Sequence, residues 1–131
     1  MSQANVEIVK ATYEAWNAGA WTPFVSCTTR TVIVRAPKGW PESGPFVGRA
    51  AFMRWCEQLR ETWDAEALEP TGDFVDVGDR VAVRHIWHGA GHGPEANLEG
   101  TNVFTVRNRR IVYQEFFSDH AEALDAVGLS E

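Results

Sequence analysis

Hydrophobic positions recur at helical spacing in two segments of the first half of the chain. The first segment follows Asn5, a residue suited to cap a helix, and stops at the Asn-Ala-Gly sequence of residues 17–19. Its apolar stripe consists of Val6, Val9, Tyr13 and Trp16. The second runs from Arg49 to Trp63, with a stripe of Phe52, Trp55, Cys56, Leu59 and Trp63. Each pattern predicts an amphipathic helix, and Thr22-Pro23 predicts a short helix between them.

Hydrophobic and polar positions alternate with a period of two from Leu68 onward. Such alternation is typical of strands, and turn residues separate the runs that show it. These runs are residues 74–77, 81–88, 96–106 and 110–117. The β-branched segment 31–36 predicts one earlier strand. Helices followed by an antiparallel meander of strands predict an α+β fold.

The composition is that of one globular domain, which we place at residues 1–131. Apolar residues make up 44% of the chain, and six tryptophans and seven phenylalanines can both fill a core and line a cavity. The net charge of −6 argues against a nucleic-acid partner and against an anionic membrane surface. Neither a secretory signal nor an apolar run of transmembrane length is present, so we expect a cytoplasmic protein.

The last hairpin gives a register from which a site can be predicted. A two-residue turn at Asn108-Arg109 would pair Arg107 with Arg110. Counting outward from that pair gives one face of the sheet that carries Asn102, Phe104, Tyr113, Glu115, Phe117 and Asp119. A carboxylate among aromatic rings has a raised pKa, so Glu115 is a candidate general acid or base. The alternative is that Glu115 lies at a rim and pairs with Arg84 or Arg110.

Asp119 follows the last predicted strand and begins a predicted helix. Asp119 and Glu122 have the spacing of a capping box, and Gly128 supplies a matching C-terminal stop. Helix capping alone therefore explains this aspartate. The two roles are compatible, because a cap at the mouth of a cavity can still face a ligand.

Histidines and cysteines suggest no metal site. His85 and His88 point to opposite faces of a strand, and His92 lies in a loop after it. His85, on the same face as Trp87, is either a proton-transfer residue or a buried core histidine. Cys27 and Cys56 are interpreted as free thiols. No nucleotide-binding or nucleophile motif occurs, and nothing requires a cofactor.

Four stretches of the chain, in this order, resemble the SnoaL-like branch of the NTF2-like superfamily. They are NVEIVKATYEAWNAGAW, VRAPKGWPESGPFVGRAAFMRW, DVGDRVAV and TNVFTVRNRRIVYQEFFSDHAEALDAVGL. The resemblance implies a cone: a strongly curved antiparallel sheet packed around N-terminal helices, with an internal apolar pocket. It also implies a homodimer formed through the outer face of the sheet.

The chemistry of that superfamily is diverse, and includes polyketide cyclases, ketosteroid isomerases, dehydratases and epoxide hydrolases. The resemblance implies that Tyr13 can act as a hydroxyl donor and Asp119 as an acid or base. The strand at 31–36 lacks the carboxylate that the isomerases use as a base. The Arg-Asp pair and second Asp of the epoxide hydrolases are not recognisable either.

The expected function is a pocket for a small apolar molecule, cyclic or polyketide-like, with cofactor-independent acid–base catalysis. Glu115 or Asp119 would be the base, and His85, Tyr13 and Asn102 would donate hydrogen bonds or orient the ligand. The expected apolar wall is Trp16, Trp40, Phe52, Trp55, Leu59, Trp87, Phe104, Tyr113 and Phe117. One alternative is a binding protein without catalysis. Another is a dimerising interaction module whose tryptophans fill the pocket.

Overall fold

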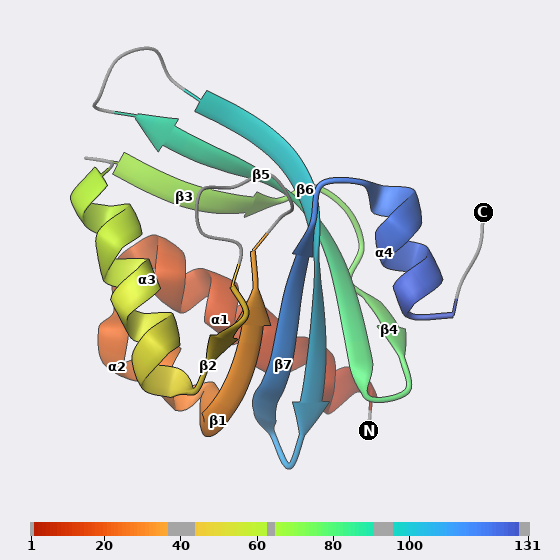
Figure 1. Ribbon diagram of the computed structural model, residues 1–131. Helices are drawn as coiled ribbons and strands as arrows, with labels where there is room; N and C mark the ends of the chain where they lie inside the picture. The colour runs from red at the N-terminus through yellow and green to blue at the C-terminus, as the bar shows by residue number, and fades with distance from the viewer. Residues whose placement is uncertain (1, 37–43, 63–64, 91–95, 129–131) are drawn as a thin grey trace.

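A computed structural model describes residues 2–36, 44–62, 65–90 and 96–128 of the chain. Figure 1 shows three helices gathered on one side of a curved sheet and a fourth helix apart from them. The helices are α1 (Ser2–Ala18), α2 (Trp21–Ser26), α3 (Arg49–Thr62) and α4 (His120–Ala126). None of the helices in these ranges is long and apolar enough to cross a membrane.

Seven strands form one unclosed sheet in the order β2-β1-β7-β6-β5-β3, with β4 paired to β5. Their bounds are β1 (Thr28–Arg35), β2 (Phe46–Val47), β3 (Ala65–Pro70), β4 (Val75–Val77), β5 (Arg80–Ala90), β6 (Ala96–Arg107) and β7 (Arg110–Phe117). The predicted α+β class is confirmed. The sheet is mixed, because β1 runs parallel to β7 while the other pairs are antiparallel.

Two helix starts differ from the prediction. The first helix begins at Ser2, so Asn5 lies inside its opening turn and does not cap it. The second begins at Trp21, with Ala20 in the cap position and no side-chain cap. Pro23 still falls in the first turn of α2, where the missing N–H of proline costs no helical hydrogen bond.

The β6–β7 hairpin turns where the sequence predicts. Arg107 pairs with Arg110 across the two-residue turn. Asn108 and Arg109 both have positive φ, at 52° and 64°. A type I′ turn requires positive φ at both positions, so Arg109 adopts the conformation that glycine would adopt more easily.

A β-bulge follows directly after this turn and overturns the predicted register. Val106 pairs with Ile111, but Thr105 pairs with Tyr113. Val112 is therefore an extra residue in β7, with no partner of its own in β6. Because side chains alternate between faces, one extra residue moves every later side chain of β7 to the opposite face.

The expected neighbours along β6 and β7 change accordingly. Asn102 pairs with Phe116 and not with Glu115, and Phe104 pairs with Gln114 and not with Tyr113. Gln114 and Phe116 thus share the inner face with Asn102 and Phe104. Tyr113, Glu115 and Phe117 lie on the outer face.

The main core lies between the inner face of the sheet and helices α1, α2 and α3. Its fully buried members include Val9 from α1, Val32 and Val34 from β1, and Val81 and Val83 from β5. A smaller cluster forms on the outer face, where Ala123 and Val127 of α4 and its C-terminal end pack on Ala82 and Val103. Part of the outer face is therefore covered by the chain itself.

Candidate functional site

A cavity of about 270 Å³ opens within the cone, between the inner face of the sheet and helices α1, α2 and α3. Aromatic and aliphatic side chains make up most of its wall, and the tryptophans among the described residues leave this space open. The lining residues are Thr12, Tyr13, Trp16, Phe24, Phe52, Trp55, Cys56, Leu59, Leu68, His85, Trp87, Leu98, Glu99, Gly100, Asn102, Phe104, Gln114, Phe116, Phe117 and Ser118.

Most residues that the sequence placed at a pocket do line this cavity. Three of the five expected catalytic residues are present: Tyr13, His85 and Asn102. Seven of the expected wall residues are also present: Trp16, Phe52, Trp55, Leu59, Trp87, Phe104 and Phe117. Phe117 is a borderline member, because its side chain packs in the outer cluster with Val103. Trp40 lies outside the described residues.

Glu115 does not line the cavity, so its expected position is wrong. The bulge at Val112 turns it to the outer face, where its Oε1 accepts a hydrogen bond of 2.9 Å from the Tyr113 hydroxyl. That hydroxyl in turn accepts one of 3.1 Å from Arg35 Nε. Tyr113 is likewise absent from the cavity wall. Its pKa is raised mainly by burial and, to a smaller extent, by the neighbouring Glu115 carboxylate.

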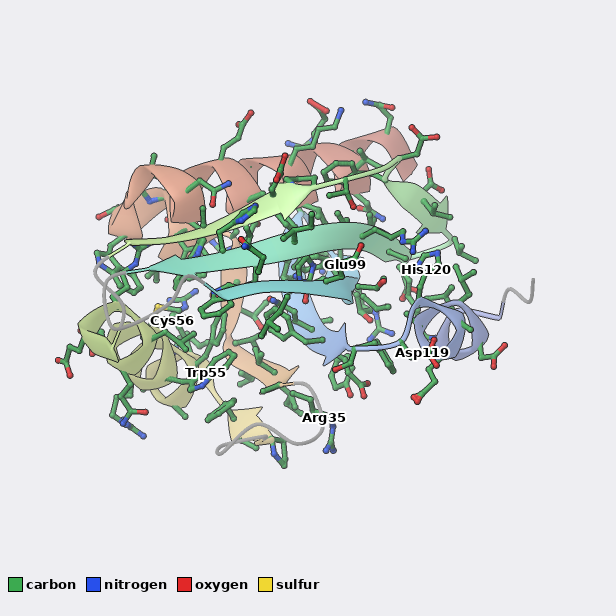
Figure 2. All side chains as sticks on the ribbon, turned by 90° about the horizontal axis from the view of Figure 1, so that it is seen from above. Arg35, Trp55, Cys56, Glu99, Asp119 and His120 are labelled. Carbon is green, nitrogen blue, oxygen red and sulfur yellow. The ribbon has the colours of Figure 1, made fainter. Side chains whose placement is uncertain are left out.

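Asp119 is the N-cap of α4, and it does not line the cavity either. Its Oδ1 accepts a 2.9 Å hydrogen bond from the backbone N–H of Ala121. Figure 2 shows Asp119 and His120 at α4, at the opposite end of the molecule from Trp55 and Cys56 on α3. The capping explanation for Asp119 accounts for what the structure shows.

Tyr13 and Asn102 form a buried hydrogen-bonded pair that joins helix α1 to strand β6. Asn102 Nδ2 donates a hydrogen bond to the Tyr13 hydroxyl oxygen at 2.8 Å. Asn102 is 0% exposed and Tyr13 is 3% exposed. Burial raises the pKa of Tyr13 above its ordinary value, and the hydrogen bond from Asn102 offsets part of the rise. Tyr13 is therefore protonated at neutral pH and is a donor, not a base.

His85 faces the same cavity from β5. Burial lowers the pKa of His85 to about 4, and the nearby Val83 backbone offsets only part of that shift. Its ring lies near Tyr13, with centroids 6.5 Å apart, and near Phe116 at 6.3 Å. The imidazole is accordingly neutral at physiological pH, with one nitrogen able to accept a proton.

Gly100 makes the space in which the His85 ring lies. A Cβ at this position would lie 3.2 Å from His85 Nε2 and 3.0 Å from the carbonyl oxygen of Phe117. Both contacts are closer than ordinary van der Waals packing allows. Gly100 on β6 is paired with His85 on β5, so the absence of a side chain at Gly100 leaves room for the imidazole ring.

Three buried polar atoms of the cavity wall lack a hydrogen-bond partner among the residues that the structure describes. They are Trp16 Nε1, His85 Nδ1 and Asn102 Oδ1. Each unsatisfied buried polar atom costs about 1–3 kcal/mol of stability. All three belong to residues that line the cavity. Unsatisfied buried polar groups call for an explanation such as a missing ligand, so this wall is the candidate site.

Metal ligands do not gather in the described ranges, where no group of three or more His, Cys, Asp or Glu side chains could hold an ion. His88 lies on the outer face, and its Nε2 is 2.8 Å from Glu69 Oε1. Cys27 and Cys56 are both free thiols, as expected.

A family model for the SnoaL-like domain matches residues 9–114, most of the chain. The chain belongs to the SnoaL-like domain family. No curated protein matches the sequence.

Solved structures share the fold of this SnoaL-like chain at low sequence identity. TerC, co-crystallised with polyporic acid, is 20% identical over 95% of this chain and 98% of TerC, with a TM-score of 0.79. IdmH of Streptomyces antibioticus, described as a proposed polyketide cyclase, is 21% identical over 95% and 99%, with a TM-score of 0.73. An NTF2-like protein of unknown function from Burkholderia pseudomallei is 22% identical over 95% and 98%, with a TM-score of 0.79.

Several lining residues of the SnoaL-like cavity were not predicted. The register expected from the sequence puts Gln114 and Phe116 on the face opposite Asn102, because it does not count the bulge. Thr12 is adjacent to Tyr13 on α1, and helical spacing could have identified it. Glu99 carried no signal, and it is the one charged residue among the described lining residues, with an exposed side chain.

Proposed function

We propose that the cavity binds a small, mostly apolar carbonyl compound and that the protein catalyses a cofactor-independent proton transfer on it. Cyclases and isomerases use this kind of reaction. The observation that carries the proposal is the meeting of the Tyr13–Asn102 pair and neutral His85 in one apolar cavity. Membership of the SnoaL-like family and the likeness to IdmH support it.

The Tyr13 hydroxyl would bind the oxygen of the ligand carbonyl. Its oxygen already accepts the hydrogen bond from Asn102, and its own proton has no acceptor among the described residues. A hydroxyl that accepts one hydrogen bond donates the next more strongly, because the bonds polarise one another. Donors aimed at a carbonyl oxygen stabilise the negative charge that develops there when an adjacent proton leaves.

His85 would take that proton. It is neutral at pH 7, so one ring nitrogen carries a free lone pair. A pKa of about 4 makes it a weak base in the empty cavity. Negative charge developing on the ligand oxygen would favour the protonated imidazole and so strengthen the base as the reaction proceeds.

Binding without catalysis is the second candidate, and one observation favours it. Within the described part of the wall, the single carboxylate is Glu99, which is exposed and not set among the buried groups. If His85 is too weak a base, the same cavity would bind the ligand and leave it unchanged.

Deuterium exchange into 2-tetralone, a cyclic ketone, separates the two candidates. In D₂O, proton NMR should show wild-type protein exchanging the protons next to the carbonyl faster than buffer alone. His85→Gln should reduce the protein-dependent rate by about a hundredfold or more, because one positioned acid–base group typically contributes about 10²–10⁴-fold. His88→Gln, on the opposite face of the same strand, is the matched control. Binding with no exchange above buffer would support the second candidate and contradict catalysis.

We also propose a homodimer formed through the part of the outer sheet face that α4 leaves open. Val47 on β2 is 65% exposed and pairs with Ile33, which gives this face an apolar edge. Light scattering should give twice the chain mass of 14.6 kDa. A mass of one chain at high protein concentration would refute the dimer.

A further inference from the structure

Resting on the proposed function, we propose that the cavity selects a ring compound carrying an uncharged hydroxyl, a phenol or a stable enol. Its hydroxyl would lie against Tyr13, Asn102 and His85, and the site would reject an anion of the same shape. An enol is also the tautomer of a ketone, so a wall complementary to it fits a site that moves protons next to a carbonyl.

The charges around the cavity argue against an anionic ligand. No lysine or arginine occurs among the described lining residues, and the single charged one, Glu99, is negative. Arg60 packs over Trp16, with its guanidinium carbon 4.2 Å from the ring centroid, but it donates to the Trp16 carbonyl and does not line the cavity. An anion would lose its hydration here without meeting an opposite charge, which is a large cost.

The unpartnered polar atoms argue for a hydroxyl over a bare carbonyl. Asn102 Oδ1 is a buried acceptor without a donor, and neutral His85 supplies a second acceptor. The Tyr13 hydroxyl proton and Trp16 Nε1–H are donors without acceptors in the described structure. A ketone oxygen only accepts, whereas a hydroxyl both donates and accepts. A hydroxyl can therefore satisfy members of both sets at once.

The rest of the wall suits a flat ring system. Aromatic rings from α1, α2, α3, β5, β6 and β7 line it, among them Trp16, Phe24, Phe52, Trp55, Trp87, Phe104 and Phe116. The volume of about 270 Å³ is near the lower end of the range for small-molecule pockets, roughly 300–1,000 Å³. Two fused rings are a suitable first probe.

Three probes of one shape test this selectivity: 2-naphthol, naphthalene and naphthalene-2-carboxylate, titrated by calorimetry at neutral pH. We expect 2-naphthol to bind about tenfold more tightly than naphthalene, the effect of satisfying one buried polar group. The carboxylate should bind more weakly than either. Equal or tighter binding of the carboxylate, or no gain of naphthol over naphthalene, would overturn the inference.

Asn102→Leu supplies the matched variant, because leucine has the same number and branching of side-chain heavy atoms as asparagine and no polar atoms. Naphthalene should bind this variant as it binds the wild type, which also reports a folded cavity, while the advantage of naphthol should fall to about threefold or less. A full tenfold advantage in this variant would refute the role of Asn102. If none of the three probes binds, the proposed function is contradicted as well. If naphthol is selected but tetralone exchange does not occur, only the proposed catalysis is contradicted.

Discussion

His85 is neutral because the fold buries it, and this has a consequence for stability. An unfolded histidine titrates near its ordinary pKa of 6.5, but folded His85 titrates at about 4. Between these values the unfolded chain holds a proton that the folded chain does not. Stability from this group is therefore complete above about pH 6.5 and is lost as the pH falls toward 4, by about 3 kcal/mol in total.

Urea unfolding at two pH values tests this consequence. From about pH 7.5 to about pH 5.0 the wild type should lose about 2 kcal/mol more free energy of unfolding than His85→Gln does. The carboxylates titrate in both proteins and cancel in the comparison. An equal loss in the two proteins would show that His85 is not held neutral by burial.

Even a methyl group at Gly100 should crowd its neighbours, because the His85 ring and the Phe117 carbonyl oxygen lie close to where its Cβ would be. Gly100→Ala should lower the free energy of unfolding by about 1–3 kcal/mol and shift the His85 ring into the cavity. Gly72→Ala is the control, since a Cβ there meets nothing within 4 Å. Thermal unfolding measures both, and equal melting temperatures for the two variants would contradict the packing.

At the scale of the element, β7 shows why a site prediction can fail on one residue. The turn at Asn108-Arg109 follows from local preferences, and it was predicted correctly. The bulge at Val112 has no such signal, because no glycine or proline marks it and both faces of β7 carry large apolar residues. Periodicity therefore placed Tyr113 and Glu115 on the wrong face.

Helix α4 illustrates the opposite case, in which a local motif was sufficient. The spacing of Asp119 and Glu122 predicted an N-cap, and Asp119 Oδ1 accepts the capping hydrogen bond. The sequence also allowed a catalytic role for this aspartate. Asp119 does not line the cavity, so the acid–base proposal involves other residues.

Two substitutions separate capping from catalysis at Asp119. Asp119→Ala should lower the free energy of unfolding by about 1 kcal/mol, and Asp119→Asn should keep most of that stability because asparagine also caps helices. Chemical denaturation measures both. Neither change should alter tetralone exchange beyond the loss of folded protein, so a stable Asp119→Asn variant with abolished exchange would contradict the cap-only role.

At the scale of the whole molecule, the cone was predictable from the order of its elements and from family resemblance. Helical stripes on α1 and α3 and alternation in β5 and β6 are strong local patterns. They group Tyr13, His85 and Asn102 with apolar neighbours, and the structure shows that these faces are the inner ones. The pairing of β1 with β7 was not predictable, because it joins strands separated by most of the chain. Strand β2, two residues long, gave no periodic signal.

The central claim is that a ligand meets His85 inside the cone. Histidines on the outer face provide internal controls, since His88 is near Glu69 and His120 contacts Thr101. With ¹⁵N-labelled histidine, and with His85→Gln to assign the signal, saturating 2-naphthol should shift the imidazole resonances of His85 and leave those of His88 and His120 in place. Shifts at His88 or His120 with His85 unchanged would place the ligand on the outer face and contradict the account.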